Sequence, residues 1–364
     1  MLSTLNRYIA GRILRGIAIA FLVVTTVIML VDFVESSRNL DGDSEITALQ
    51  LMYLTVLKTP KFVEQTIAFV VLFGVMGALH SMNKRSELIV VRAAGVSVWR
   101  FLQPALIVTA LLGIIWMTAF NPFASRMLAL QQTQTTQWLS GQSNNQVKDI
   151  WLREGTDISQ TVIHASQLEL QDKRLINPVF YQLSVISDGS TKFTRRFDAS
   201  SATLVTQGYW QLEDVVENAP GELKQNHQTI SLPTKITVED LQAEASIIAE
   251  PAFWDIPQAI KDNEQAGFST RALRMKLNRL LSLPVILIAM TFIAASASLN
   301  LAREGGTIKL LVTGAALGFA VYFIDSMISA FGQVSTLPVH LASWSVPIFA
   351  LLTGISYLSK IEDG

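Results

Sequence analysis

Long apolar runs occupy both ends of the chain, and a polar stretch separates them. Each run approaches the roughly 20 residues that an α-helix needs to cross a hydrocarbon core about 30 Å thick. Because the runs are long and carry few charges, they predict six transmembrane helices, three before and three after the polar stretch. The predicted spans are about 13–34, 62–79, 101–120, 280–301, 310–327 and 341–358.

The polar stretch follows a period of two instead of a helical period. Residues alternate between apolar and polar in short segments, at 149–153, 161–164, 180–186, 193–197 and 209–212. Turn-forming residues, such as those at 188–190 and 219–221, separate these segments. Short strands at such spacing are typical of sandwich and jelly-roll sheets. We therefore predict a β-jelly-roll-like domain over 122–262, in which 250–265 forms a short helix leading back to the membrane.

Composition supports this division into membrane and exported parts. Half of the residues are apolar and 16% are charged, well below the roughly 25% of an ordinary soluble domain. Residues 122–262 carry 17 acidic and 11 basic side chains, a net charge of −6, whereas the rest of the chain has +5. Neither part is basic enough to suggest nucleic acid as a partner. The chain has no cysteine, so the polar domain has to fold without disulfides.

Basic residues beside the spans predict the orientation, since cytoplasmic flanks are enriched in Lys and Arg. With the N-terminus inside, the cytoplasmic flanks carry Arg7, Arg12, Arg15, Lys84, Arg85, Arg92, Arg100, Arg303, Lys309 and Lys360. The opposite short loops carry Arg38, Lys58 and Lys61. Both termini are therefore expected in the cytoplasm and 122–262 outside. One group opposes the trend on the outer side of the fourth span, namely Arg271, Arg274, Lys276 and Arg279.

Enzyme motifs are missing from the sequence. No Gly-Lys dipeptide exists, which excludes a P-loop, and the four histidines form no His-Glu-x-x-His pair. We expect no catalytic residues, no metal site and no cofactor. Ionisable groups within spans are functional candidates by default because burying them is costly. Glu64 and Asp325 are the clearest of these, and for Asp325 we expect a hydrogen-bonded structural role.

The turn between the second and third spans contains a short amphipathic helix. Ser86 is expected to cap its first amides, and Glu87 suits the positive end of its dipole. Leu88 and Val91 fall near one face, and Gly95 ends the helix. Two interpretations are open at this point. The helix lies on the membrane surface, or it docks a soluble partner.

Four sequence features together resemble one known family. They are Ser86-Glu87-Leu88 with Ala94-Gly95-Val96-Ser97, Pro60-Lys61 at the second span, Asn121-Pro122 after the third, and Asp325 within Tyr322-Phe323-Ile324-Asp325. They resemble the LptF/LptG permease family, the membrane subunits of the lipopolysaccharide exporter of Gram-negative bacteria, and the LptG branch more than the LptF branch. The resemblance covers the whole chain. It implies an inner-membrane protein of outer-membrane biogenesis, an α-helical membrane protein with an inserted periplasmic β-jelly-roll.

The resemblance also implies partners and a role for the short helix. The partners are an LptF-like permease subunit, a dimer of an LptB-like ATPase and an LptC-like protein. The helix at about 84–98 is then the coupling helix that inserts into the ATPase, with Glu87 and Arg92 as polar contacts. Its coupling residues are Ser86, Glu87, Leu88, Arg92 and Gly95. ATP hydrolysis belongs to the partner, which agrees with the missing P-loop.

A lipopolysaccharide cavity needs basic groups at its outer rim for lipid A phosphates, and apolar walls for acyl chains. Lys61 matches the family's basic position at the second span and is our main candidate. The other rim candidates are Arg38, Lys58, Arg126, Arg271 and Arg274. The wall candidates are Phe33, Phe69, Phe73 and Phe319. The competing interpretation is that basic side chains only anchor helix ends to headgroups, which we expect of Lys276.

Two rival functions remain open. A regulatory, mechanotransmitting protein of the FtsX/MacB kind predicts four spans with the large loop after the first, which the order of apolar runs disfavours. An intramembrane hydrolase predicts paired ionisable groups at matching depth. Glu64 and Asp325 stand in separate spans without an obvious partner in the sequence. Three regions organise the chain in our interpretation, namely helices over 1–121, the polar domain over 122–262 and helices over 263–364.

Overall fold

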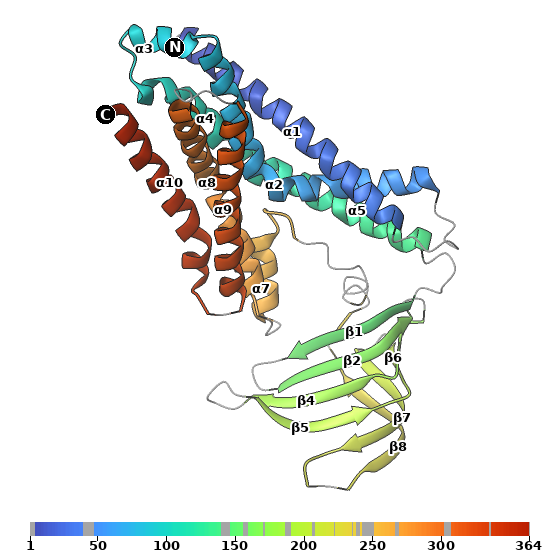
Figure 1. Ribbon diagram of the computed structural model, residues 1–364. Coiled ribbons are helices and arrows are strands. Elements are labelled where there is room, and N and C mark those ends of the chain that lie inside the picture. The colour runs from blue at the N-terminus through green and yellow to red at the C-terminus, as the bar shows by residue number, and fades with distance from the viewer. Residues whose placement is uncertain are drawn as a thin grey trace. The chain divides into compact units, whose positions relative to one another are not determined.

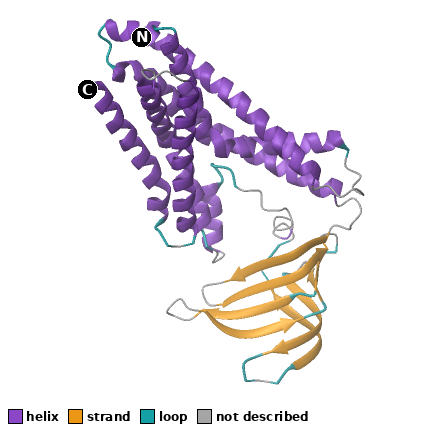
Figure 2. Ribbon diagram, viewed as in Figure 1, coloured by secondary structure: helices purple, strands orange, loops and turns teal. Residues whose placement is uncertain are grey.

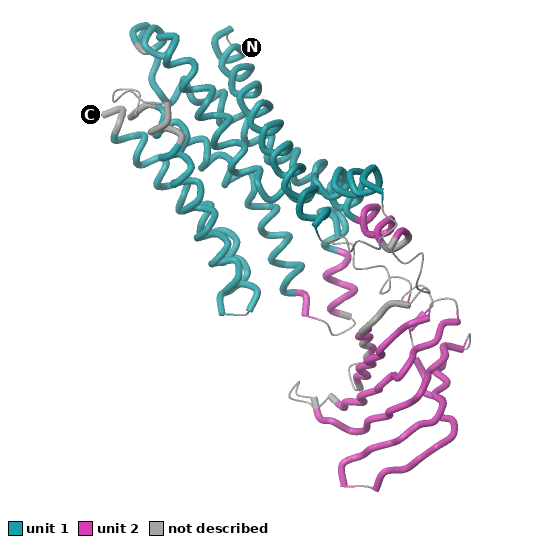
Figure 3. The backbone as a smooth tube through the Cα atoms, turned by 45° about the vertical axis from the view of Figure 1, so that its right-hand side comes forward, with its two compact units in different colours: residues 1–128, 251–257, 271–364 teal, residues 129–250, 258–270 magenta. Residues whose placement is uncertain are grey.

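The computed structural model describes residues 4–38, 47–139, 146–155, 159–169, 172–185, 191–205, 208–221, 223–234, 236–237, 241, 251–265, 269–301, 307–334 and 336–363. The chain divides into two compact units (Figure 3). One comprises residues 1–128, 251–257 and 271–364, and the other comprises 129–250 and 258–270. The first unit is built from helices, whereas strands dominate the second (Figure 2).

Long helices make up the first unit (Figure 1). They are α1 (Thr4–Arg38), α2 (Ala48–Lys84), α4 (Val98–Ile115), α8 (Arg271–Leu301), α9 (Thr307–Gln333) and α10 (Val339–Asp363), with the short α3 (Glu87–Ala93) after α2. A π-helical turn, η1 (Trp116–Phe120), joins α4 to α5 (Asn121–Leu139). Within the described residues, six helices are long and apolar enough to cross a membrane. The six predicted apolar helices are therefore confirmed.

These helices extend beyond the apolar runs because hydropathy marks their lipid-compatible part, not the end of the hydrogen-bonded backbone. The third helix shows the largest difference. It was expected to end near residue 120, but α4, η1 and α5 continue it to Leu139. The first described strand consequently begins only at Gln146. The helix expected over 250–265 occupies Ile256–Gln265 (α7), and residues 242–250 lie outside the described part.

Glycines allow the membrane helices to approach at backbone distance. A Cβ atom at Gly16 of α1 would lie 2.4 Å from the carbonyl oxygen of Gly74 in α2. A Cβ atom at Gly113 of α4 would lie 2.6 Å from the Cα of Pro284 in α8. Because neighbouring apolar side chains gain little from leaving lipid, such close backbone packing is a principal source of helix association in membranes. It joins α1 to α2 and α4 to α8.

The second unit is an antiparallel sheet. Its strands are β1 (Gln146–Gly155), β2 (Ser159–Glu169), β3 (Arg174–Ile176), β4 (Val179–Val185), β5 (Thr191–Asp198), β6 (Ser201–Val205), β7 (Tyr209–Asn218) and β8 (Gln225–Pro233). Strand β2 pairs with β4 over 159–164 and with β3 over 167–169 in one unbroken register. Strand β7 pairs with β6 and then β5 in the same manner. The pairings therefore form a meander in which β3–β4 and β5–β6 are two bent strands.

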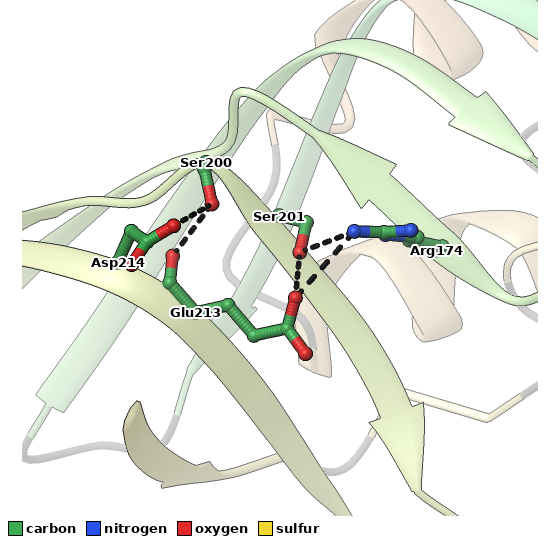
Figure 4. Close-up of polar contacts among 5 residues, drawn as sticks. All are labelled: Arg174, Ser200, Ser201, Glu213 and Asp214. Carbon is green, nitrogen blue, oxygen red and sulfur yellow. Dashed lines mark hydrogen bonds and ion pairs between the residues drawn. The ribbon is translucent and has the colours of Figure 1, made fainter. Parts of the chain in front are cut away.

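Hydrogen bonds between neighbouring strands stabilise the bend. Between the bent strands, Asn177 donates its backbone N–H to the carbonyl of Ser200, and Ala199 donates to Pro178, each at 3.0 Å. Side chains add to this (Figure 4). The Ser201 hydroxyl donates to Glu213 at 2.9 Å and accepts from Arg174 at 3.0 Å. Because Arg174, Ser201 and Glu213 come from β3, β6 and β7, this cluster connects three neighbouring strands at the bend.

Five of the strands were predicted from alternation, and three were not. Strand β3 has only three residues, too few to show a period of two. Strand β6 alternates poorly because Ser201 and Ala202 are both buried, and β8 mixes exposed and half-buried positions. The apolar interior contains large buried side chains, among them Phe180 and Trp210 in edge-to-face contact at 6.2 Å. The antiparallel sheet inserted between two sets of membrane helices agrees with the expected fold class at this level.

Candidate functional site

Helix α3 lies at the same end of the helical unit as the N-terminus and the C-terminal end of α10 (Figure 1). Its two faces differ sharply. Leu88 is buried in the same apolar core as Ile9 and Ile13 of α1. Ile89 and Val90 are 63% and 66% exposed. Helix α3 therefore holds to the unit by one face and presents an apolar surface on the other.

Backbone geometry at the ends of α3 differs from the predicted cap. Ser86 takes a left-handed conformation with φ 60°, whereas an N-cap residue is normally extended. Its carbonyl accepts a hydrogen bond from Val90 N–H at 3.1 Å. Gly95 has φ 78°, a conformation that glycine adopts at little cost. Sharp turns consequently bound α3 on both sides.

Glu87 binds within the chain rather than pointing away from it. Tyr8 donates its hydroxyl to Oε2 of Glu87 at 2.9 Å, and Arg12 donates to Oε1 at 3.3 Å. Both partners come from α1. Of the two expected polar contacts of the coupling helix, Glu87 is thus engaged by α1, and the side chain of Arg92 lies outside the described part. Sequence reasoning did not identify this contact. Tyr8 and Arg12 are four residues apart and share one face of α1, but their partner is 75 or more positions away.

Lys61, the main rim candidate, lies in the N-terminal half of α2, away from α3. Its ammonium group contacts Oε2 of Glu64 at 3.2 Å, and the two side chains are 14% and 11% exposed. The other oxygen of Glu64 accepts a hydrogen bond from the amide of Asn121 in α5. Glu64 therefore has the partners that the sequence did not reveal, and its charge is balanced by Lys61.

The same Asn121 holds the segment that returns from the sheet unit. Its side-chain oxygen accepts the backbone N–H of Phe253 at 2.7 Å. The indole of Trp254 donates to the Thr118 carbonyl at 2.9 Å. That carbonyl is available because Pro122, four residues later, has no N–H to donate. The Asn121-Pro122 motif and the π-helical turn thus create a binding site for residues 251–255, a role that sequence reasoning did not assign.

Lys58 and Asp32 form an ion pair near the same end. The Lys58 ammonium group contacts Asp32 Oδ1 at 2.8 Å and lies 4.9 Å from the centre of the Phe62 ring. The Asp32 side chain is only 9% exposed. Arg38, at the end of α1, and Arg126, in α5, are both exposed. Of these four basic and acidic positions, the two arginines present the more accessible cations.

Most of the four basic residues before the fourth span form contacts with other segments of the helical unit. Arg271 donates to the backbone carbonyls of Gly332 and Leu337, at the end of α9 where helix carbonyls lack partners within the helix. Arg279 pairs with Asp325 of α9 at 3.1 Å, so the structural role expected of Asp325 has a specific partner. Lys276 donates to the Pro251 carbonyl at 2.8 Å. Arg274 is exposed.

Of the four predicted wall residues, Phe69 and Phe319 make aromatic contacts, and the other two are partly buried. Phe69 of α2 contacts Tyr322 of α9, with ring centres 5.4 Å apart. Phe319 is 60% exposed and stacks on Phe323 at 6.0 Å. Phe33 and Phe73 are half-buried. The structure thus places Phe69 and Phe319 on neighbouring helices, because Gly318 of α9 packs on Leu72 and Phe69 of α2.

Comparisons with known proteins match almost the whole chain. The family described as "Lipopolysaccharide export system permease LptF/LptG" matches residues 7–360. One curated relative is the lipopolysaccharide export system permease protein LptG of Haemophilus influenzae, which is 22% identical over 358 residues. The alignment covers 93% of this chain and 93% of the relative. These matches agree with the resemblance found in the motifs at 60–61, 86–97, 121–122 and 322–325.

Proposed function

The chain belongs to the LptF/LptG family of lipopolysaccharide export system permeases, and from this premise we propose that it is the LptG-like half of an ABC-type exporter. In this role it extracts lipopolysaccharide from the inner membrane and passes it to a periplasmic bridge. A separate LptB-like ATPase dimer supplies the energy. The single observation that carries the proposal is the two-faced α3 at the end of the unit that holds both termini.

The apolar outer face of α3 supports its role as the coupling helix. Ile89 and Val90 are exposed on a seven-residue helix, and a short helix that offers apolar anchors suits insertion into a groove of a partner. Leu88 packs into the apolar core of the helical unit, and in this proposal it holds α3 to that unit. Both termini and α3 are cytoplasmic in this proposal, since the basic flanks of the spans lie at this end.

Helices α1 and α9 support the pairing with an LptF-like subunit. In the apolar stretch of α1 only 11% of the residues are buried, and in that of α9 only 17%. These are the two lowest values among the six candidate spans in the described part of the chain. Exposed side chains of α9 include Phe319, Phe323 and Met327. We infer that these two faces line the lipid cavity and meet the second permease subunit. Phe33, Phe69 and Phe73 then complete the acyl wall.

The outer end of the helices supplies the phosphate contacts in this proposal. Arg38, Arg126 and Arg274 are exposed and accessible to a phosphate group. Lys58, Lys61 and Arg271 already hold acidic or carbonyl groups. Lys61 therefore has to exchange Glu64 for a phosphate oxygen, an exchange that Asn121 supports because it continues to hold the released carboxylate.

The sheet unit is the periplasmic conduit in this proposal. Its antiparallel strands pack around an apolar cluster, and in this proposal the unit stands at the place of the β-jelly-roll expected for the family. We propose that it lies in the periplasm and adjoins the jelly-roll of an LptC-like protein. Residues 122–262 carry a net charge of −6, and we therefore assign phosphate binding to basic side chains of the helical unit.

A reconstitution experiment tests the proposed function. The chain is co-expressed with its LptF-like, LptB-like and LptC-like partners, and lipopolysaccharide release from proteoliposomes is followed with and without ATP. ATP-dependent release, lost when the chain is omitted, supports the proposal. A photo-crosslinker at Lys61 should capture lipopolysaccharide before ATP is added. Adducts elsewhere in the cavity but none at Lys61 would move the phosphate site, and no release with the complete set of partners would refute the function.

The rival functions find less support in the described residues. Six candidate spans with the sheet unit after the third differ from the four-span plan of FtsX-like proteins. Glu64 and Asp325 each have a separate basic partner, Lys61 and Arg279. Because the two carboxylates are not paired with each other, they do not form the acid–base pair that an intramembrane hydrolase would need.

A further inference from the structure

A three-residue clasp, formed by Tyr8, Arg12 and Glu87, joins α3 to α1. Tyr8 and Arg12 lie one turn apart on α1 and bind different oxygens of the same carboxylate, at 2.9 and 3.3 Å. The arginine guanidinium also lies 5.8 Å from the centre of the Tyr8 ring. All three side chains are therefore fixed relative to one another, across 75 residues or more of sequence.

The clasp is stronger than an ordinary surface ion pair. Arg12 and Glu87 side chains are only 21% and 26% exposed, and water screens a pair less at such sites than at a fully exposed one. Within the described residues, the Arg12 Nε atom is buried without an acceptor. Glu87 is thus the main group that compensates the buried part of this guanidinium, and losing it would leave Arg12 poorly satisfied.

Apolar packing lies directly beside the clasp. Ile9 and Ile13 follow Tyr8 and Arg12 in sequence and are fully buried in the core that contains Leu88. The clasp and this core hold the same face of α3. Val90 is exposed at the position i+3 from Glu87, and Ile89 is exposed on the opposite side of the helix. A partner that binds over Ile89 therefore has access to α3 without disturbing Glu87.

The turns that bound α3 favour movement together with α1. The left-handed residues Ser86 and Gly95 separate α3 from α2 and from α4, so neither helix continues rigidly into it. Helix α1 is the least buried of the six candidate spans in the described part of the chain. A displacement of α3 is therefore carried by its side-chain contacts, and the strongest polar contacts that we find lead to α1.

We propose that Glu87 is a positioning residue that links α3 to the first membrane helix through Arg12 and Tyr8, so that displacement of α3 by the ATPase moves α1. The inference rests on the proposed function, in which α3 docks the ATPase. It differs from the expectation that Glu87 itself contacts the ATPase. The ATPase binds the exposed face of α3, whereas Glu87 transmits the resulting force to α1.

Charge reversal separates the two roles. The complete complex is purified with Glu87→Arg, with Arg12→Glu, and with both substitutions together. We expect each single variant to retain the ATPase and its hydrolysis, but to release about tenfold less lipopolysaccharide per ATP, a loss on the scale of about 1.4 kcal/mol. The double variant restores the ion pair in reversed order and should return to within about threefold of the native yield. Arg15→Glu, at an exposed position of the same helix, is the matched control and should leave the yield unchanged.

A second measurement keeps the test independent of transport. Because the chain has no cysteine, spin labels at Leu14→Cys and Ile89→Cys report the position of α3 relative to α1 without interference. The distance distribution should be narrow in the native background, broad with Arg12→Glu, and narrow again in the double reversal.

The outcomes are distinguishable. If Glu87→Arg loses the ATPase, Arg12→Glu keeps it and the double variant does not recover, then Glu87 contacts the partner directly and the clasp proposal is overturned. Equal distance distributions in all variants would overturn it as well. If the native complex neither binds the ATPase nor releases lipopolysaccharide, the proposed function fails instead, whereas the distance measurement still tests the clasp.

Discussion

Asn121 joins three parts of the helical unit through one amide group. It is fully buried, donates to Glu64 of α2 and accepts from the backbone of Phe253. Asn121→Ala would leave a buried carboxylate oxygen and a backbone N–H without these bonds, at about 1–3 kcal/mol for each group. We expect a lower unfolding temperature of the purified protein in detergent, measured by intrinsic fluorescence.

The control for Asn121 is Gln65→Ala, an exposed amide on α2, which should leave the unfolding temperature unchanged. A second readout is proteolysis of the 251–255 segment, which should become faster in Asn121→Ala alone. Equal stability of both variants would show that the Asn121 bonds contribute little.

At the residue scale, the sequence identified the charged and polar side chains but not the groups that they contact. The ion pair between Lys61 and Glu64 was not predicted, although the two residues are three apart and helix geometry makes such a contact local. Asn121 and Phe253 are separated from their partners by 57 and 132 positions, and no local pattern reveals such contacts. Arg271 was expected at the rim because its backbone partners are likewise distant in the sequence and no local pattern reveals them. Its charge is visible in the sequence, but the two carbonyls that it binds come from the last turn of α9 and from the residues that follow it, more than 60 positions away.

At the element scale, the contact between α1 and α2 depends on two glycines. A side chain at Gly16 would meet the backbone of Gly74 at 2.4 Å, and backbone atoms cannot move aside as a flexible side chain can. Gly16→Val should therefore separate the helices and lower the unfolding temperature by several degrees. Gly77→Ala, where no atom lies within 4 Å of the added Cβ, is the control and should be neutral or slightly stabilising, since alanine favours helix by about 1 kcal/mol over glycine. A neutral Gly16→Val would contradict the close approach.

The bend of the sheet is the second feature argued at this scale. Ser201 is 2% exposed and bridges Arg174 and Glu213 (Figure 4). Ser201→Ala removes both bonds and should destabilise the bend by about 1–3 kcal/mol. Hydrogen exchange of the amides at 199–201 should accelerate, because local opening costs less free energy there. Ser231→Ala, exposed on β8, should exchange as the native protein does. Unchanged exchange at 199–201 would show that the backbone bonds alone hold the bend.

The limits of prediction at this scale have physical reasons. Membrane spans were predictable because the bilayer demands long apolar segments whatever their neighbours are. The arms β3 and β6 of the two bent strands were not, since each bend interrupts the alternation while the pairing register continues across it. The helical continuation to Leu139 was missed because α5 is polar and has no apolar period to detect.

At the scale of the whole molecule, the exposed aromatic face of α9 tests the proposed assembly. Phe319 and Phe323 stack on each other and are 60% and 52% exposed. If the face meets lipopolysaccharide or the LptF-like subunit, Phe319→Ala and Phe323→Ala should each lower ATP-driven release by about tenfold, because truncating an aromatic anchor at an interface costs more than 1 kcal/mol. Stability of the isolated chain should not change, since the two rings cover little of its own core.

The chain offers a matched control for that prediction in Phe349 of α10, which is 67% exposed. If Phe349 faces only lipid, Phe349→Ala should leave release unchanged, because lipid tails fill the space of the lost ring at little cost. Equal, native-like release by the α9 and α10 variants would place the α9 face against lipid as well, and the cavity would then have to be lined by other helices. A loss confined to α9 would instead locate the transport path beside α2, where Phe69 contacts Tyr322 at 5.4 Å and the acyl wall continues from one helix to the next.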